Sequence, residues 1–283
     1  MKEFLSNTFE SQNVSANTIL RTDIREHFKI ANHLDLGLDS LKPTVWILVE
    51  SFGVRVDFKQ NDEEFAVFKD NDVSFFGIKM RNVGFTQGAE YEDFSTPKGE
   101  DNPKNRIKKY KEALYETWYL HGYDKNFYDR AKTYGAFGFD SLKFRSDLRD
   151  SLDICFFGFQ GICDTAMITY IDKLLQDSVK KMIYWTTLDS HTPYDLQKTA
   201  DTSLCKEYEL NPVECVHETH ILRTLKHISK LADRHKNYRF IIQGDHRPMG
   251  SVKTRKFLAS FYYNWVPVII LNDSFSSKKG KKM

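Results

Sequence analysis

The sequence has no apolar run long enough to cross a bilayer and no large excess of charge of either sign. Its 283 residues include 41 Lys and Arg against 39 Asp and Glu. No stretch approaches the ~18 consecutive apolar residues that a membrane-spanning helix requires, and residues 1–20 lack the unbroken apolar stretch of a signal peptide. Nucleic-acid-binding domains usually carry a basic excess. We therefore expect no nucleic-acid partner.

Cysteine is scarce, and its spacing excludes two common kinds of site. The four residues are Cys155, Cys163, Cys205 and Cys215. None forms a C-x-x-C pair, so the usual zinc and thioredoxin spacings are absent. In an oxidising compartment 155–163 and 205–215 would close two short loops as disulfides. Four reduced cysteines packed as small core residues explain the spacing equally well.

Short apolar runs alternate with amphipathic segments along most of the chain. The runs are rich in β-branched and aromatic residues, as strands buried on both faces are; they cover 45–50, 182–189, 239–245 and 265–271, with a weaker candidate at 154–159. Helical spacing of apolar residues covers 104–120, 165–181 and 219–235. This alternation predicts one α/β domain, with a mostly parallel central sheet and helices on both faces.

Residues with metal-binding and acid–base chemistry follow three of the predicted strands. In open α/β sheets functional residues gather beyond the carboxyl ends of the strands. These ends carry carboxylates, histidines and hydroxyls that suit a divalent metal; the segments are Glu50-Ser51, Asp189-Ser190-His191 and Asp245-His246.

Each of these residues also has a purely structural explanation. Glu50 could cap a following helix, and His246 could be a hydrogen-bonded loop histidine. The Asp245-His246 pair is harder to explain structurally, because Gly244 before it and Pro248 after it restrict the backbone path. We interpret the pair as functional.

Two hydroxyl side chains are candidate nucleophiles. Ser51 lies in VESFG, which partly matches the nucleophile elbow G-x-S-x-G but lacks its first glycine. Thr86 lies in VGFTQGAEYEDF, where a helix could begin. A hydroxyl at a helix N-terminus feels the positive end of the helix dipole, and a bound metal would lower its pKa further. An ordinary N-cap explains Thr86 equally well from the local sequence.

Six segments in order resemble the sulfatase-like branch of the alkaline phosphatase superfamily. They are WILVESFG, the Thr86 segment, HGYDKNFYDRAKTYGAFGFD, GFQGICDTA, TTLDSHTPY and QGDHRP. The resemblance is closest to the membrane-anchored phosphoglycerol and phosphoethanolamine transferases, including lipoteichoic acid synthase and the osmoregulated-glucan phosphoglycerol transferases. It runs from about residue 44 to 272. Each motif alone is weak, but six in the family order are specific.

The resemblance implies a metal site and a nucleophile. Glu50, Asp245 and His246 match the family's metal ligands, and Thr86 matches the threonine that binds the metal and becomes phosphorylated. It implies one divalent ion, Zn²⁺ or Mn²⁺, with Mg²⁺ also compatible with these ligand types. The second-metal histidine cluster of some phosphoethanolamine transferases is not evident in the sequence.

Further matches concern the substrate phosphate. His121, Arg130 and His191 match positions that hold this phosphate or assist the leaving group, and Tyr128 matches an aromatic residue of the same pocket. True sulfatases carry C-x-P-x-R or S-x-P-x-R, and neither pattern occurs here. The resemblance therefore disfavours sulfate-ester hydrolysis.

The resemblance also implies domain limits and a location. Residues 1–43 are expected to lead in from a missing membrane anchor, 44–275 to form the catalytic domain, and 276–283 to be a basic tail. Paired cysteines occur in extracytoplasmic relatives, which favours disulfides 155–163 and 205–215. We expect the chain in the periplasm or at the outer face of the bacterial inner membrane.

The expected activity is transfer of a phosphoglycerol or phosphoethanolamine group. A phospholipid would be the donor, and a cell-surface glycan or a lipid-linked molecule the acceptor. Two alternatives remain: an acyl hydrolase using Ser51 with a carboxylate and His246, and a non-catalytic glycan-binding module on the same fold. A serine-directed fluorophosphonate probe would identify the hydrolase, and metal content with phosphodiester turnover would exclude the binding module.

Overall fold

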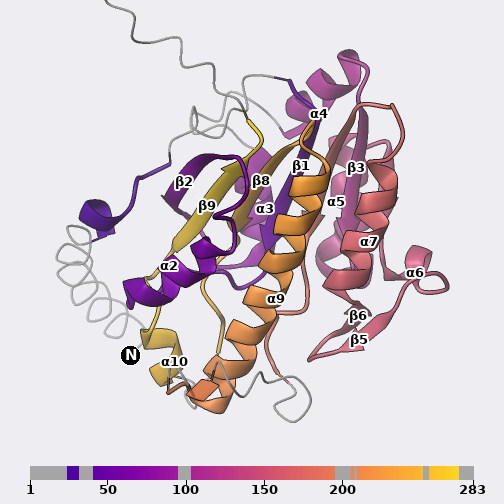
Figure 1. The fold of residues 1–283 in the computed structure, drawn as a ribbon. Helices are drawn as coiled ribbons and strands as arrows, with labels where there is room; N and C mark the ends of the chain where they lie inside the picture. The colour runs from indigo at the N-terminus through magenta and orange to yellow at the C-terminus, as the bar shows by residue number, and fades with distance from the viewer. Residues whose placement is uncertain are drawn as a thin grey trace, which may run out of the picture.

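A seven-stranded sheet forms the centre of the protein (Figure 1), in the order β2-β9-β8-β1-β7-β3-β4. The structure, a computed structural model, describes residues 24–31, 41–94, 103–194, 205–206, 209–250 and 255–273. The strands of this sheet are β1 Thr44–Val49, β2 Val73–Met80, β3 Glu116–His121, β4 Ser141–Lys143, β7 Lys181–Thr186, β8 Arg239–Gly244 and β9 Trp265–Leu271. All are parallel except β9, which runs antiparallel to both β2 and β8.

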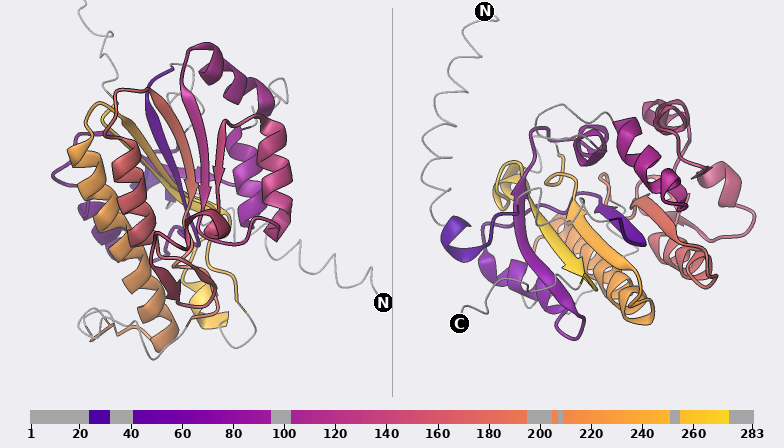
Figure 2. Two further views of the ribbon diagram at one scale, coloured as in Figure 1. Left: turned by 90° about the vertical axis from the view of Figure 1, so that its right-hand side faces the viewer. Right: turned by 90° about the horizontal axis from the view of Figure 1, so that it is seen from above.

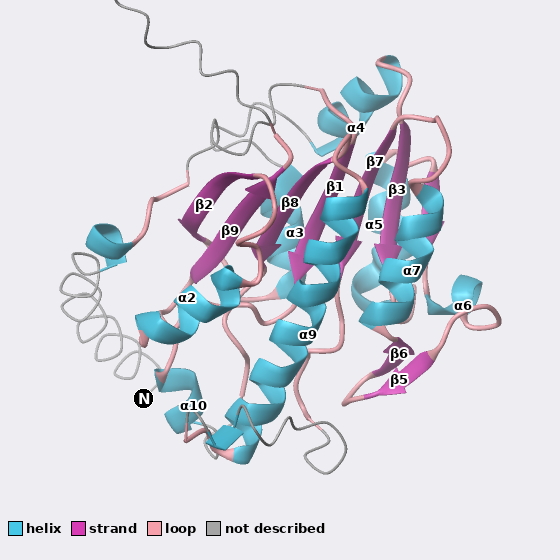
Figure 3. Ribbon diagram, in the orientation of Figure 1, coloured by secondary structure: helices cyan, strands magenta, loops and turns pink. Residues whose placement is uncertain are grey.

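Helices cover both faces of this sheet, as Figure 2 shows in its edge-on view. One layer contains α7 and α9, and the other contains α3, α4 and α5 (Figure 3). The helices are α2 Phe58–Ala66, α3 Thr86–Phe94, α4 Pro103–Glu112, α5 Arg130–Phe137, α6 Arg145–Leu148, α7 Asp164–Leu174, α9 Pro212–Arg234 and α10 Arg255–Ala259, with a 3₁₀ turn at Phe127–Asp129. The predicted α/β class with a mostly parallel sheet is confirmed.

Strand β1 shows why the sheet needs both helical layers. Val45, Ile47 and Val49 belong to the core on the side of α7 and α9, whereas Trp46 and Leu48 belong to the core on the other side. Successive strand residues point to opposite faces, so a strand apolar at every position must be covered twice. Burying each such side chain contributes roughly 1.5–3 kcal/mol.

The four main strand predictions correspond to β1, β7, β8 and β9, while the fifth needs correction. The 154–159 candidate shortens to β5 Ile154–Phe156, which pairs with β6 Gln160–Ile162 in a separate two-stranded sheet. The 182–189 run also ends early, because β7 stops at Thr186. The sequence prediction missed β2, β3 and β4.

Each of the three predicted helices is present in part, but their bounds are wrong, and α2, α5, α6 and α10 were not predicted. The 104–120 helix is wrong in its second half, since α4 ends at Glu112 and Glu116–His121 is β3. The helix predicted at 165–181 ends at Leu174.

Helix α9 begins seven residues before the predicted 219. Asn211 caps it by accepting hydrogen bonds from the backbone N–H groups of Val213 and Glu214, and Pro212 occupies the first turn. The Glu214 side chain accepts from Asn211 N, which completes a capping box.

Both predicted disulfides, Cys155–Cys163 and Cys205–Cys215, are present. The part of the chain that the structure describes contains no helix with the length and apolar character needed to cross a membrane. Residues 24–31 contact the sheet: Ala31 N donates to Ile78 O and Ile78 N donates to Lys29 O. The basic tail 276–283 lies outside the described residues.

Candidate active site

Three predicted metal ligands meet at the carboxyl ends of two neighbouring strands. Glu50 follows β1, and Asp245 and His246 follow β8, which pairs with β1. All three side chains are buried, and one potential ligand atom of each lies within 4.8 Å of the others. The fold thus brings together residues almost 200 positions apart in the sequence.

The backbone around this cluster is tightly constrained. A Cβ atom added at Gly244 would lie 1.8 Å from the carbonyl oxygen of Phe52, so only glycine fits between the two strand ends. Ser51 adopts a positive φ of 58°, which costs roughly 1–3 kcal/mol for a residue with a side chain. Its N–H group donates to Asp245 Oδ1 at 2.8 Å, and this bond holds the strained turn against the cluster.

Thr86 is the first residue of α3, and its hydroxyl faces the cluster. Thr86 Oγ1 donates to Glu50 Oε2 at 3.0 Å and lies 3.3 Å from His246 Nε2. The side chain is 5% exposed. The N-terminus of a nine-residue helix therefore places a hydroxyl, in a positive dipole field, beside three potential metal ligands.

The electrostatics of the cluster favour a cation. Burial and the neighbouring charge of Glu50 raise the pKa of Asp245 well above its usual range. Burial acts against ionisation of Glu50 too, but His191 and His246 outweigh it and lower the pKa of Glu50. Asp245 Oδ2 is buried and accepts no hydrogen bond from the described residues. A carboxylate oxygen that accepts no hydrogen bond, 3.2 Å from His246 Nε2 and beside a second carboxylate, fits a divalent metal ion.

Arg130 and Tyr128 lie close together, at the start of α5 and just before it. The Arg130 guanidinium lies 5.1 Å from the centre of the Tyr128 ring and 3.4 Å from Glu90 Oε1. Gln87, next to Thr86, donates through Nε2 to the carbonyl oxygen of Tyr128 at 3.3 Å. This bond connects the Thr86 end of α3 to the segment that carries Arg130.

His121 and His191 lie at the ends of neighbouring strands β3 and β7. Burial and the positive charge of Arg130 lower the pKa of His121 well below its usual range, so this imidazole is neutral. Its Nδ1 lies 3.2 Å from the carbonyl oxygen of Thr186, which selects the Nδ1–H tautomer and leaves Nε2 as an acceptor. The His191 ring packs edge-on against Phe159, with ring centroids 4.3 Å apart.

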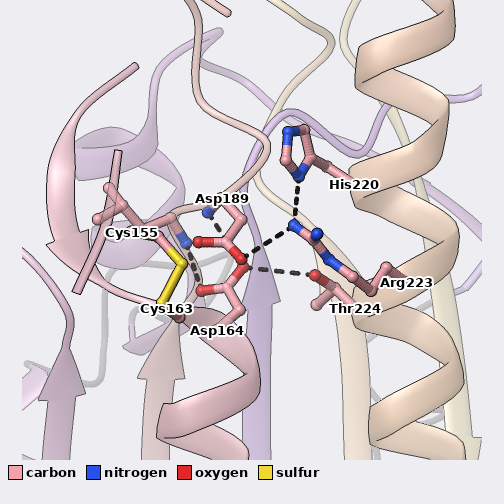
Figure 4. The surroundings of a disulfide bond; sticks show 8 residues. Cys155, Cys163, Asp164, Asp189, His220, Arg223 and Thr224 are labelled. Atoms are coloured by element: carbon pink, nitrogen blue, oxygen red, sulfur yellow. Dashed lines mark hydrogen bonds and ion pairs between the residues drawn. A yellow bond between two sulfur atoms is a disulfide. The ribbon is translucent and has the colours of Figure 1, made fainter. Parts of the chain in front are cut away.

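Asp189 does not join the metal cluster, although it follows a strand at the same edge. Figure 4 shows it beside Asp164 and facing Arg223 of α9, close to the Cys155–Cys163 disulfide. Asp189 Oδ2 lies 3.4 Å from Arg223 Nη2, and its N–H donates to Asp164 Oδ2 at 3.0 Å. Asp164 thereby fixes the start of the loop that carries His191.

The arrangement around Ser51 does not support the acyl-hydrolase alternative. Ser51 Oγ donates to Glu50 Oε1 at 2.9 Å and is 1% exposed. No described imidazole is hydrogen-bonded to this hydroxyl; the contact from His217 Nε2 is to the Ser51 carbonyl oxygen. A serine–histidine pair of the hydrolase kind is thus missing among these residues.

The sequence analysis missed the buried ion pairs that support the cluster. Arg81, after β2, donates to Asp93 of α3 at 2.5 Å and to the carbonyl oxygen of Gly244 at 2.8 Å. This single side chain ties α3 to the end of β8, immediately before Asp245. The sequence contained one indication of these ion pairs. Glu90 and Asp93 lie one and two helical turns after Thr86, so they share a helix face with the candidate nucleophile.

Comparisons with known proteins agree with this geometry. The Sulfatase family model matches residues 73–257. A comparison with curated proteins finds no significant match. Among solved structures, the lipoteichoic acid synthase LtaP from Listeria monocytogenes is similar at 15% identity and a TM-score of 0.59, covering 88% of this chain and 71% of that one.

Two further solved structures share the fold at similar distance. The Streptococcus pyogenes phosphoglycerol transferase GacH, in complex with sn-glycerol-1-phosphate, has 14% identity, a TM-score of 0.51, and coverage of 92% and 74%. The C-terminal periplasmic domain of EcEptC from Escherichia coli, in complex with Zn, has 12% identity, a TM-score of 0.50, and coverage of 83% and 74%.

The family model covers more than half of the chain, from β2 to α10. It excludes Glu50 but includes Thr86, Asp245 and His246, which the fold brings to one cluster. The chain therefore belongs to the sulfatase family, a sulfatase-like branch of the alkaline phosphatase superfamily.

Proposed function

We propose that this chain transfers a phosphoglycerol or phosphoethanolamine group from a phospholipid to a hydroxyl group of a cell-surface glycan or lipid acceptor. The observation that carries the proposal is the position of Thr86 Oγ1, 3.0 Å from Glu50 and 3.3 Å from His246 at a helix N-terminus. Sulfatase-family membership and the shared fold of two transferases support the reaction class.

Glu50, Asp245, His246 and Thr86 would hold one divalent metal ion, Zn²⁺, Mn²⁺ or Mg²⁺. When bound, the ion would supply Lewis-acid chemistry, lowering the pKa of the hydroxyl and neutralising charge on the phosphate. The single unpaired oxygen of Asp245 and the buried Glu50 beside it support this assignment.

The first chemical step is attack of the Thr86 oxygen on phosphorus. Thr86 enters the step as the alkoxide, its proton having passed to solvent. A bond forms between Thr86 Oγ1 and phosphorus, and the bond from phosphorus to the oxygen of the lipid alcohol breaks. Arg130 presents a planar fork that matches two phosphate oxygens, and Tyr128 lies against its guanidinium. His191 gives a proton to the departing alcohol.

The second step returns the threonine. The acceptor hydroxyl attacks the phosphothreonine and passes its proton to His191, which gave one up in the first step, and the bond from phosphorus to Thr86 Oγ1 breaks to return the Thr86 alkoxide. Over the cycle one proton moves from the acceptor to the lipid alcohol, so the chain is unchanged. His121 can accept a hydrogen bond from the acceptor hydroxyl, because burial and Arg130 keep it neutral and leave its Nε2 as an acceptor.

The proposed location is extracytoplasmic, in the periplasm or at the outer face of a bacterial inner membrane. Two disulfides support it, because disulfides form and persist in oxidising compartments. The membrane-anchored transferases suggest that a membrane anchor would bring the domain to its donor.

Mass spectrometry of the protein after incubation with single phospholipids tests the proposal. We expect an added phospho-alcohol group on the peptide that contains Thr86, with a mass that identifies the donor head group. Thr86→Ala should abolish both the adduct and turnover, whereas Thr169→Ala, an exposed threonine of α7, should change neither. Substantial turnover by Thr86→Ala, or cleavage of aryl sulfates in preference to phosphodiesters, would refute the assignment.

A further inference from the structure

The segment that leaves the metal cluster is basic and free of acidic residues. Residues 247–263 read RPMGSVKTRKFLASFYY, with four Arg or Lys and no Asp or Glu. The chain as a whole is nearly balanced, with 41 basic and 39 acidic residues. Positive charge is therefore concentrated in the part of the sequence that follows His246.

This segment lies at the same edge of the sheet as the candidate active site. Its helix α10 lies beyond the carboxyl ends of β1 and β8 (Figure 1). Backbone hydrogen bonds join it to the loop after β1: Tyr262 N donates to Val54 O at 2.8 Å, and Val56 N donates to Ser260 O at 2.8 Å. A surface that docked here would therefore face the Thr86 cluster.

Several exposed side chains on this segment, and Val56 in the loop bonded to it, are cationic or apolar. Arg255 and Lys256 are exposed and form no ion pair with the described residues. Met249 is 41% exposed, Val56 43% and Tyr263 57%. We name this surface the basic-apolar rim; its members are Val56, Arg247, Met249, Arg255, Lys256 and Tyr263.

A contact between Arg247 and Tyr263 joins a cationic and an aromatic member of the rim. The Arg247 guanidinium lies 4.9 Å from the centre of the Tyr263 ring, in a cation–π arrangement. Arg247 Nη1 also donates to the carbonyl oxygen of Leu258 at 2.9 Å, which fixes its position over α10. The rim is thus an ordered surface of the folded domain.

We propose that the basic-apolar rim docks on the surface of a bilayer that contains anionic phospholipids. The charge fits such a surface, because basic side chains are attracted to anionic headgroups. The apolar members favour a bilayer over a soluble polyanion, since Met, Val and Tyr side chains gain by entering the interface between headgroups and acyl chains. Neither attraction alone gives stable binding, but the two together do.

The inference rests on the proposed function in one respect, that the donor is a membrane phospholipid. Docking through the rim would hold the Thr86 cluster at the headgroup level. Vesicle binding itself requires no turnover, so it can be measured separately.

Co-sedimentation with vesicles tests the proposal. The probes are vesicles of phosphatidylcholine alone and of phosphatidylcholine mixed equally with phosphatidylglycerol. We expect binding to the mixed vesicles that weakens with added salt. Each cation contributes about fivefold to the partition coefficient, so Arg255→Glu/Lys256→Glu should lower binding by at least about 25-fold.

The matched control for charge is Lys226→Glu/Lys230→Glu, which changes two exposed lysines of α9. They lie in the half of α9 that approaches the start of β8, at the opposite edge of the sheet. This control should alter binding by about twofold or less, because screening limits distant charges. An equal loss in both double variants would overturn the assignment to the rim.

A second pair of variants separates a bilayer from a soluble polyanion. Met249→Ser/Tyr263→Ser should lower vesicle binding about tenfold, whereas Val179→Ser, an exposed residue just before β7, should not. Unchanged binding by Met249→Ser/Tyr263→Ser, with competition by long-chain polyphosphate, would assign the surface to a soluble polyanion and overturn the proposal. Equal binding of the parent to both kinds of vesicle would overturn it as well.

Two measurements distinguish failure of the docking proposal from failure of the proposed function. The rim variants should retain turnover of a soluble chromogenic phosphodiester, which also shows that they fold. Thr86→Ala should bind vesicles as the parent does. If the parent binds the mixed vesicles through the rim but forms no adduct at Thr86, the proposed function fails and the docking surface remains.

Discussion

Thr86 and Glu90 lie one turn apart on α3, and their side chains hold two different parts of the candidate site. Thr86 Oγ1 donates to Glu50 Oε2 at 3.0 Å, whereas Glu90 Oε1 lies 3.4 Å from Arg130 Nε. Both residues are buried. One short helix therefore sets the distance between the proposed nucleophile and the guanidinium that would bind the phosphate.

Glu90 is the centre of a buried hydrogen-bond network, and its charge should matter for stability. Its carboxylate accepts from three hydroxyl groups besides facing Arg130: Tyr119, Tyr134 and Thr186. Burial, and then the charge of Glu90, raise the pKa of Tyr119 and of Tyr134 well above the usual range, so both remain donors.

Glu90→Gln should therefore lower the free energy of unfolding by about 3 kcal/mol, because it leaves the buried Arg130 charge unpaired. It should also lower kcat/KM for a phosphodiester, as Arg130 loses its fixed position. Urea unfolding and steady-state kinetics measure the two effects. Glu112→Gln on α4, where the side chain is 62% exposed, should cost less than about 0.5 kcal/mol. Similar losses in the two variants would show that the network has no special role.

Arg130→Lys tests the geometry of the phosphate contact, since it keeps the charge and removes the planar fork. A charge-assisted hydrogen bond contributes about 1.5–3 kcal/mol, so kcat/KM should fall by roughly 10- to 100-fold. Arg149→Lys, at a largely exposed position, provides the control and should leave kinetics unchanged. An Arg130→Lys variant with the parent's kcat/KM would remove Arg130 from the proposed phosphate site.

The sequence predicted the central strands and the gathering of Glu50, Asp245 and His246 at one edge of the sheet for a common physical reason. Strands apolar at every position can lie only in the middle of a covered sheet, and in such a sheet their carboxyl ends must meet at one edge. Glu50, Asp245 and His246 follow directly from that rule.

The predictions from sequence were wrong where tertiary contacts determine which of two possible local structures forms. Residues 113–120 have apolar spacing that fits a helix, yet Leu114 takes a positive φ of 62° and the chain turns into β3. No glycine or proline marks this turn. Asp189 follows β7 at the predicted edge of the sheet. It contacts Asp164 and Arg223, however, and does not join Glu50, Asp245 and His246. Neither partner can be identified from spacing.

Metal binding should stabilise the parent protein but not Asp245→Asn. A ligand that binds only the folded state at about 100 times its Kd stabilises it by about 2.7 kcal/mol. In the metal-free state Asn removes a buried carboxylate beside Glu50, so metal-free Asp245→Asn should be at least as stable as the metal-free parent. Thermal unfolding in EDTA measures the stability of both proteins without metal, and unfolding with Zn²⁺ or Mn²⁺ measures the change that metal causes.

The control is Asp233→Asn, in which the changed side chain is largely exposed and pairs with Lys236. It should keep the full metal-dependent rise in Tm. A rise in Tm of the same size in Asp245→Asn would show that the stabilising metal binds elsewhere.

Asp189 should make the protein less stable as the pH rises through the acidic range. Burial raises the pKa of Asp189 from its ordinary 3.8 to about 6, against the opposing charge of Arg223. Between these pH values the folded protein holds a proton that the unfolded chain has released. The stabilising effect is complete below about pH 4 and is lost as the pH approaches and passes 6, a change of up to about 3 kcal/mol.

Asp189→Asn should remove this dependence while keeping an oxygen that can accept from Arg223. The free energy of unfolding is measured in urea at pH 4.5 and at pH 7.5, on either side of the pKa of about 6. Relative to the parent, the variant should be more stable at pH 7.5 than at pH 4.5. Asp150→Asn changes a fully solvated carboxylate and should run parallel to the parent. If the Asp189→Asn curve also runs parallel to that of the parent, the carboxyl of Asp189 does not contribute to stability in the acidic range.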